Sequence, residues 1–359
     1  MIVVVLLGFF ATISAFIARK TKYVYALKIS FMFVFLFLAL RYAYGNDYMS
    51  YYDTFMAINQ EKKVDFYNFK ALNGPSMLEP GWVLLCWLFK PFGFYVMVVV
   101  LALFNCYAYY HLVSKYVPQK YYWFSIFIYI INPIFMLIQL SAMRQAVAIG
   151  IFLISIDFLI KKDIFKYIIL IIVASLFHSS ALLMLPLVII SIYDINYNKF
   201  IFIFSIFVYV FAAFSGNIFL PYIDIAVNNY FPKYSSYVDP GKFGSGLGVL
   251  YGFIVLALVL YFIKYEKSDY SVLYKVLILS IIIMPLSIHI NMLGRMQMYF
   301  QPIALVVYPL VFLKINNAFI RNIFICMIVA FAIRSVFLFI ESDVWGPYYL
   351  EYNTIINAL

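Results

Sequence analysis

The chain alternates between long apolar runs and short polar segments. The runs are continuously apolar, as in residues 168–190, and lack the alternation of a membrane-barrel strand. A helix of about 20 apolar residues crosses the hydrocarbon layer of a bilayer. The pattern therefore predicts an all-α polytopic membrane protein with about 11–12 transmembrane helices. We expect these spans near residues 1–18, 23–40, 94–113, 121–138, 141–160, 165–178, 180–196, 199–214, 248–264, 271–290, 298–315 and 323–340.

Two apolar segments do not fit a simple crossing. Residues 81–89 are too short to span a bilayer and stop at Lys90-Pro91, which predicts a short re-entrant or interfacial helix. Residues 167–190 are long enough for one span, but a single span would invert the second half of the chain relative to its basic loops. We therefore expect a break at residues 178–180, with two short crossings that meet near the outer surface.

Basic residues mark the short loops between the apolar runs. The loops that the positive-inside rule places in the cytoplasm are residues 19–22, 114–120, 161–166, 264–275 and 314–321. The two long segments at residues 41–80 and 215–247 then form external loops, and the tail at residues 341–359 faces the same side. We treat residues 1–359 as a single integral-membrane domain.

Composition narrows the function classes. Hydrophobic residues make up 67% of the chain and charged residues only 11%, whereas soluble domains have about 25% charged residues. The net charge of +10 is spread over the loops rather than gathered on one face, so we expect no nucleic-acid partner. The three cysteines lie in apolar stretches with no metal or disulfide spacing. The Asp-x-Asp, phosphate-loop and His-Glu-x-x-His motifs are absent, so we expect no metal and no cofactor.

Arginine is rare and unevenly placed. Six arginines stand against nineteen lysines, and four of them, Arg41, Arg144, Arg295 and Arg334, lie inside or beside apolar runs. A charge at the centre of a bilayer costs roughly 2.5–3.5 kcal/mol. The predicted orientation places all four towards the outer face, where their planar donor forks suit a pyrophosphate leaving group. The alternatives are snorkelling for Arg41 and an ion pair with Glu341 for Arg334.

Two carboxylates and a histidine are candidates for acid–base chemistry at the same face. Asp47 follows a Gly-Asn turn, and Glu79 precedes a Pro-Gly-Trp segment beside a membrane helix. Either could take a proton from an attacking hydroxyl, or serve as a turn residue or as the partner of an arginine. His178, at the predicted break, is a candidate acid, base or donor, with a structural role as the alternative. His111 and Asp157 lie at inner helix ends, where a structural role is favoured.

Short motifs follow one another in order between residue 41 and about residue 300. They are Arg41, Gly45-Asn46-Asp47-Tyr48 with Tyr51, Glu79-Pro80-Gly81-Trp82, Met143-Arg144-Gln145-Ala146, Phe177-His178-Ser179-Ser180 and Arg295 with Tyr299-Phe300. Their order and approximate spacing resemble the EpsG-type branch of the Wzy polysaccharide (O-antigen) polymerases. The usual Leu-Arg-Gln core of that family has Met143 in place of leucine here. Residues 200–290 match no motif, so the resemblance says nothing about sugar choice.

The resemblance implies a GT-C-like, metal-independent glycosyltransferase of the bacterial inner membrane. Such an enzyme joins oligosaccharide repeat units carried on undecaprenyl pyrophosphate, at the outer face of the membrane. The implied partners are the lipid-linked donor and acceptor and the membrane lipid, with room for a chain-length regulator.

The resemblance also suggests roles for individual residues. Arg144 and Arg295 would bind the pyrophosphate, with Arg41 assisting. Either Glu79 or His178 would activate the acceptor hydroxyl. The third catalytic residue, Asp47, would orient the sugar or an arginine, and the supporting residues would be Gln145, Tyr299 and Arg334.

Two other functions fit an apolar chain with buried charges. A lipid-linked oligosaccharide flippase would need charges facing a cavity at the bilayer midplane, and clustering of the arginines on one side disfavours it. A membrane O-acyltransferase that acts on the glycan would place a histidine on a tunnel reaching the cytoplasm. The predicted position of His178 near the outer face disfavours that function.

Overall fold

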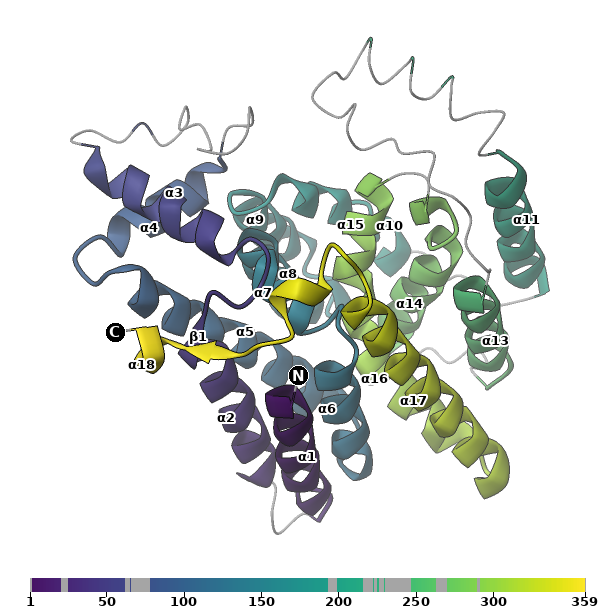
Figure 1. The fold of residues 1–359 in the computed structure, drawn as a ribbon. Coiled ribbons are helices and arrows are strands. Elements are labelled where there is room, and N and C mark those ends of the chain that lie inside the picture. Colours follow the sequence, from purple (N-terminus) through teal and green to yellow (C-terminus); the bar gives the residue numbers. More distant parts are fainter. Residues whose placement is uncertain are drawn as a thin grey trace.

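The computed structural model describes residues 2–20, 25–61, 78–192, 199–215, 247–262, 270–288 and 291–358, together with a few isolated positions between them. Nearly all of the described chain is helical (Figure 1). The predicted external loop at residues 215–247 lies almost entirely outside the described residues, as does the stretch 66–77 of the other external loop.

The first half of the chain builds a helical bundle with a short two-helix unit beside it. Its elements are α1 (Ile2–Ile17), α2 (Tyr25–Leu40), β1 (Arg41–Tyr42), α3 (Tyr48–Gln60), α4 (Pro80–Leu88), α5 (Phe94–Tyr116), η2 (Gln119–Tyr121), α6 (Tyr122–Ile131), α7 (Leu137–Ser141), α8 (Met143–Ile160), α9 (Ile164–Ser175), η3 (Ser179–Met184) and α10 (Leu187–Ile192).

The second half packs around the end of this bundle and returns to it. Its elements are α11 (Lys199–Ser215), α13 (Leu247–Phe262), α14 (Ser271–Ile283), η5 (Leu286–Ile288), α15 (Asn291–Phe300), η6 (Gln301–Ile303), α16 (Ala304–Lys314), α17 (Ala318–Ile340), η7 (Gly346–Tyr348), β2 (Asn353–Thr354) and α18 (Ile355–Ala358).

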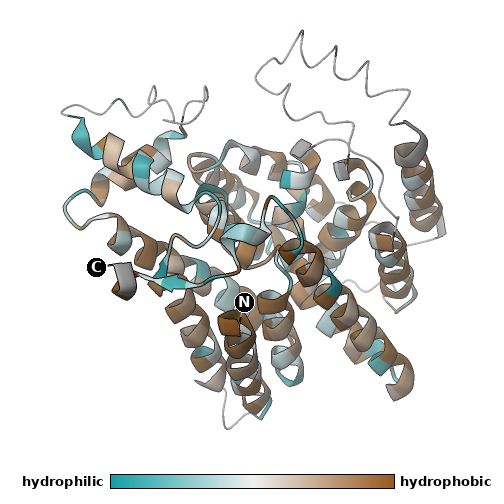
Figure 2. Ribbon diagram, in the orientation of Figure 1, coloured by the Kyte–Doolittle hydropathy of each residue, from teal (hydrophilic) through white to brown (hydrophobic). Residues whose placement is uncertain are grey.

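The helices confirm the predicted class of an all-α polytopic membrane protein. Among the described residues, four helical segments are long and apolar enough to cross a bilayer, and seven shorter helices are also apolar. Hydrophobic residues dominate the helices on their outer surfaces as well as inside (Figure 2). Apolar side chains on both faces of a helix are typical of a protein that lies in lipid.

The central wall of the structure is the segment Leu293–Lys314. Of its apolar window, 78% is buried, against 22% for the peripheral helix α17. Its last helix, α16, contacts α5, α6, α13 and α14, and so joins the two halves of the chain. Most side chains of this segment are therefore surrounded by other helices, whereas most side chains of α17 face outwards.

Three predicted spans differ from the observed helices at a proline. The span 121–138 stops at Ile131, because Pro133 follows and the Asn132 side chain accepts a hydrogen bond from the Ile134 N–H at 3.2 Å. The span 271–290 stops at Ile283 before Pro285 in the same way. The span 298–315 begins within α15, and Pro302 lies in the 3₁₀ turn η6 that links α15 to α16.

The C-terminal tail is bound to the segment that follows α2. β1 and β2 pair antiparallel, with Arg41 opposite Thr354 and Tyr42 opposite Asn353. The Tyr349 hydroxyl donates to the Leu137 carbonyl at 2.8 Å and also bonds Ser141 at 2.6 Å. The tail thus ties the end of α2 to the α7 turn, although the two lie far apart in the sequence (Figure 1).

The short helix α4 packs on the break that was predicted at residues 178–180. α9 ends at Ser175, and η3 begins at Ser179, so the break is present. The Gly81 N–H donates to the Leu176 carbonyl at 2.9 Å, and a Cβ at Gly81 would lie 2.7 Å from that oxygen. Only glycine allows the two backbones to approach so closely.

We expect Gly81→Ala to separate α4 from the α9 end and to destabilise the protein by about 1–3 kcal/mol, as overpacking does elsewhere. The thermal unfolding midpoint in detergent measures this loss. The control is Gly252→Ala in α13, where the added Cβ meets side chains only at 3.6 Å. An unchanged midpoint for Gly81→Ala would contradict the close approach of the two backbones.

Candidate active site

Glu79 is aimed by the proline that follows it. A residue before proline is held extended, and Glu79 has φ −66° and ψ 137°. Pro80 is the first residue of α4, and the Glu79 side chain does not cap that helix. The carboxylate is therefore free to reach across to other elements.

Arg144 meets Glu79 from the first turn of α8. The chain breaks at Ala142 between α7 and α8, which places Arg144 at the start of a helix. Its Nη1 donates to Glu79 Oε2 at 2.5 Å, and the two side chains are 27% and 16% exposed. The guanidinium also interacts with the phenol of Tyr51 on α3, and its Nε is buried with no partner among the described residues.

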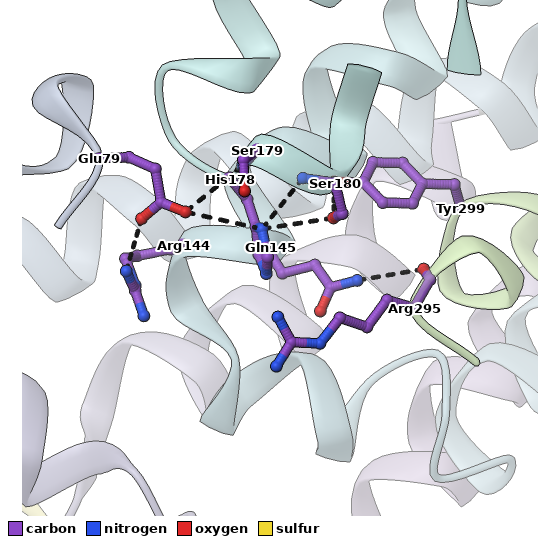
Figure 3. A network of polar contacts seen from close by, with 8 residues as sticks. All are labelled: Glu79, Arg144, Gln145, His178, Ser179, Ser180, Arg295 and Tyr299. Carbon is purple, nitrogen blue, oxygen red and sulfur yellow. Dashed lines mark hydrogen bonds and ion pairs between the residues drawn. The ribbon is translucent and has the colours of Figure 1, made fainter. Parts of the chain in front are cut away.

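The second oxygen of Glu79 faces the break after α9. Oε1 accepts a hydrogen bond from the Ser179 N–H at 3.3 Å and lies 3.8 Å from Nδ1 of His178 (Figure 3). Glu79 thus joins the start of α8 to the start of η3. An arginine on one oxygen and a backbone amide on the other fix the carboxylate in one orientation.

A chain of hydroxyl groups continues from His178 to α15. The Ser180 hydroxyl lies 3.3 Å from Nδ1 of His178 and 3.2 Å from the hydroxyl of Tyr299 (Figure 3). The Ser180 N–H donates to Nδ1 at 3.4 Å in the tautomer that has its proton on Nε2, whereas in the other tautomer Nδ1 donates to the Ser180 hydroxyl. Nε2 of His178 has no partner among the described side chains.

Arg295, on α15, lies close to His178. It precedes Tyr299 by one turn of α15, and its carbonyl accepts a hydrogen bond from the Gln145 side chain at 3.2 Å. The charges of Arg295 and Arg144 both act on His178. Residues from α8, α15, η3 and the start of α4 therefore converge, and we call Glu79, Arg144, His178 and Arg295 the polar cluster (Figure 3).

Asp47 lies next to this cluster, at the start of α3. Partial burial raises the pKa of its carboxyl above the ordinary value, and the positive charge of Arg144 opposes that shift. Asp47 forms no side-chain cap on α3. The carboxylate is therefore near enough to Arg144 to influence it, while Glu79 forms the direct ion pair.

Arg41 occupies a different place from the other predicted arginines. It is 3% exposed, its Nη1 donates to the Leu38 carbonyl at 2.6 Å, and its guanidinium carbon lies 5.7 Å from the Tyr48 ring centre. It lines a small cavity of about 30 Å³ together with Asn105 and Gln139. None of the contacts found in the described structure joins Arg41 to the polar cluster.

Arg334 is also separate from the polar cluster. It lies on α17 and lines a larger cavity formed with α13, α14, α15 and α16. The alternative pair with Glu341 is not formed, because no ion pair of the described residues joins the two side chains. Of the expected supporting residues, Gln145 and Tyr299 contact the cluster and Arg334 does not.

The inner helix ends hold a second group of polar side chains with a structural role. Asp157 on α8 accepts hydrogen bonds from Lys115 and Tyr116 and lies 2.9 Å from Nε2 of His111, all on α5. These contacts join α5 to α8 and are the structural partners expected for Asp157. No group of three or more metal-binding side chains forms among the described residues.

Three members of the network were not predicted as site residues. They are Tyr51, which contacts Arg144, and Ser179 and Ser180, which hold Glu79 and His178. The signal for the serines was present, since two small hydroxyl residues beside a histidine at a helix break can satisfy its ring nitrogen. Tyr51 belongs to the motif that follows Arg41, but its contact with Arg144 depends on how α3 packs, which the sequence does not show.

Comparison with known proteins identifies a family. A model of the EpsG family matches residues 24–354, which include every element of the polar cluster. No curated protein matches the chain, and no solved structure matches it.

A double-mutant cycle with Glu79→Gln and Arg144→Gln tests the central ion pair. Because both side chains are mostly shielded from water, we expect a coupling free energy of unfolding of about 1–3 kcal/mol. The measurement is unfolding of the purified protein in mixed detergents. The matched control is the exposed pair Asp163–Lys166, for which we expect no measurable coupling. Additive effects at Glu79 and Arg144 would contradict the ion pair.

Proposed function

The chain belongs to the EpsG family, and from this we propose that it polymerises a polysaccharide by joining lipid-linked oligosaccharide repeat units. The substrates are repeat units on undecaprenyl pyrophosphate, and the product is an O-antigen, a capsule or an exopolysaccharide. The reaction takes place at the outer face of the bacterial inner membrane, and the protein acts as a metal-independent glycosyltransferase.

One observation carries the proposal, namely the convergence of Arg144, Arg295, Glu79 and His178 at one place. Two guanidinium groups beside a carboxylate and an imidazole are what a transfer from pyrophosphate to a hydroxyl requires. The arginines stabilise the leaving group, and the other two groups manage the proton of the acceptor.

Arg144 can bind a pyrophosphate without releasing Glu79. A guanidinium has five N–H donors in a planar fork, and Glu79 occupies only the Nη1 side. Tyr51 contacts the same guanidinium, but the Nε of Arg144 is buried and has no partner among the described residues, so that donor remains for an anion. Each donor aimed at a developing negative charge contributes about 2.7–4 kcal/mol to transition-state stabilisation.

His178 is the better placed of the two candidate bases. Both oxygens of Glu79 already accept a hydrogen bond, one from Arg144 and one from the Ser179 N–H. In the His178 tautomer with the proton on Nδ1, that N–H donates to the Ser180 hydroxyl and Nε2 carries the free lone pair. Glu79 then holds Arg144 and His178 in position, as the aspartate of a catalytic triad does.

The step balances with these groups. The acceptor hydroxyl oxygen attacks the anomeric carbon of the donor, and its proton passes to Nε2 of His178. The bond between the anomeric carbon and the pyrophosphate oxygen breaks, and undecaprenyl pyrophosphate leaves with its negative charge opposite Arg144 and Arg295. Asp47 orients the sugar or Arg144, Gln145 and Tyr299 hold α15 and Ser180, and Arg41 supports the external segment from its buried position.

A transporter function has weaker support. A flippase needs charges along a path between the two faces, whereas the described cluster gathers at adjacent helix starts. A membrane O-acyltransferase is supported only by the single buried histidine and uses neither arginine.

The direct test is to incubate the purified protein in detergent with repeat units on undecaprenyl pyrophosphate. We expect a ladder of polymers on a gel and no ladder without protein. Arg144→Lys keeps the charge but loses the fork, so we expect it to reduce the rate by 10²–10³-fold, on the scale of one lost donor. Arg321→Lys on α17 is the matched control, and wild-type rates for Arg144→Lys would overturn the role in pyrophosphate binding.

Substitution of each candidate base shows whether His178 or Glu79 accepts the proton of the acceptor hydroxyl. We expect His178→Gln to lower the turnover rate by about 10²–10⁴-fold while substrate binding stays close to wild type. Because the two residues act together, adding Glu79→Gln lowers the rate little further. The control is His111→Gln, which changes a histidine on α5 that contacts Asp157 and lies outside the polar cluster. A small effect of His178→Gln beside a large effect of Glu79→Gln would make Glu79 the base.

A further inference from the structure

A second cavity lies beside the polar cluster, on the far side of α15. It has a volume of about 490 Å³ and is lined by α13, α14, α15, α16, α17 and the chain between α6 and α7. We call it the α17 cavity. Its volume falls in the range of about 300–1,000 Å³ that is usual for pockets that bind small molecules.

Several of the polar side chains around the α17 cavity already have hydrogen-bond partners within the protein. Gln297 accepts a hydrogen bond from the Ser280 hydroxyl at 2.7 Å and donates to the Ser280 carbonyl at 2.6 Å. Ser335 donates to the Phe331 carbonyl at 2.9 Å. The Oε1 atom of Gln301 is buried with no partner among the described residues.

Arg334 is the one charged side chain among the lining residues. Within the described structure it forms no ion pair or hydrogen bond, and its nearest aromatic contact is Phe331, whose ring centre is 6.0 Å away. No aspartate or glutamate lines the cavity. A guanidinium in apolar surroundings is costly without an anion, and its planar fork suits a phosphate group.

The helix α15 is a wall shared by the two sites. Arg295 and Tyr299 lie one turn apart and belong to the polar cluster, whereas Gln297 and Gln301 lie one turn apart and line the α17 cavity. Positions two apart in a helix differ by about 200°, so these pairs lie on opposite faces. The two sites are therefore separated by about 10–12 Å, the diameter of one helix with its side chains.

We propose that the α17 cavity binds the phosphate-bearing head of a second polyprenyl-linked substrate. Arg334 faces the phosphate, and the apolar walls contact the adjoining part of the polyprenyl chain. This inference rests on the proposed function, because joining two lipid-linked units requires two such lipids at once. The polar cluster holds one of them, and the α17 cavity holds the other across α15.

The apolar walls identify the source of the phosphate. A free phosphate or pyrophosphate would use only Arg334 and would leave the rest of the cavity without contacts. A polyprenyl phosphate supplies both an anion and an apolar chain, and so matches both parts of the lining.

Native mass spectrometry of the detergent-purified protein with undecaprenyl pyrophosphate counts the bound lipids. We expect two per protein chain in the wild type, one in Arg334→Gln, one in Arg144→Gln and none in the double variant. Arg321→Gln, which removes the same charge from the other end of α17, keeps two. Arg334→Lys binds the second lipid at least tenfold more weakly than the wild type but better than Arg334→Gln.

The outcomes separate this inference from the proposed function. One bound lipid in the wild type, lost only in Arg144→Gln, would overturn the second site and leave the proposed function standing. Two lipids in Arg334→Gln would also overturn it. One lipid lost only in Arg334→Gln would support the α17 cavity and overturn the role of the polar cluster.

Two further ligands test the chemistry of the site. Undecaprenol has the chain without the phosphate, and inorganic pyrophosphate has the anion without the chain. We expect neither to fill the second site at the concentration that saturates it with undecaprenyl pyrophosphate. Equal binding of undecaprenol would overturn the role of Arg334, and equal binding of inorganic pyrophosphate would overturn the lipid as the occupant.

A labelling experiment tests the same site in a protein that keeps Arg334, in case the Arg334 variants do not fold. In Ser335→Cys the new thiol lines the cavity, and native Cys326 on the same helix is exposed elsewhere. We expect undecaprenyl pyrophosphate to slow maleimide labelling at position 335 at least fivefold and to leave Cys326 unchanged. Equal labelling at position 335 with and without the lipid would overturn the proposal.

Discussion

The ion pair between Arg144 and Glu79 is the interaction on which the arrangement of the site depends. A charge held in an apolar bundle is costly unless a partner neutralises it, and here each charge neutralises the other. The pair also has a mechanical effect, because Glu79 precedes α4, Arg144 begins α8, and the second Glu79 oxygen binds the start of η3. One carboxylate thus sets the relative positions of three elements.

The same region shows why the helices must break where they do. A continuous helix satisfies its own backbone groups and presents few polar atoms inside a membrane. The interruptions at Ala142 and at His178 expose a helix start and a backbone amide, and both are used by the polar cluster. The glycine contact between α4 and the end of α9 keeps these starts close together. The breaks are therefore what turns an apolar bundle into a polar site.

The buried Arg41 and the half-buried Arg334 differ in what surrounds their charge. Arg41 is stabilised by the Leu38 carbonyl and by neighbouring tyrosines, and it fixes the external segment where the C-terminal tail returns. Arg334 has no such partner among the described residues and faces a cavity. This difference assigns Arg41 mainly to the structure and Arg334 to a ligand. It also gives α15 a central place, because one face of that helix belongs to each site.

The sequence by itself determined the class of the fold and most members of the site. Continuous apolar runs of this length indicate membrane helices, because a helix satisfies all its backbone groups within lipid. The short length of residues 81–89 predicted the short helix, and the segment around His178 predicted the break. Hydropathy is averaged over a window of residues, so it did not predict that helices end before Pro133 and Pro285, although both prolines are present in the sequence. The tertiary structure alone decided that Glu79 bonds Arg144, that Arg41 lies apart and that Arg334 faces a cavity. Periodicity states which face of a helix a residue occupies, but which helix that face meets follows from packing between segments far apart in the chain.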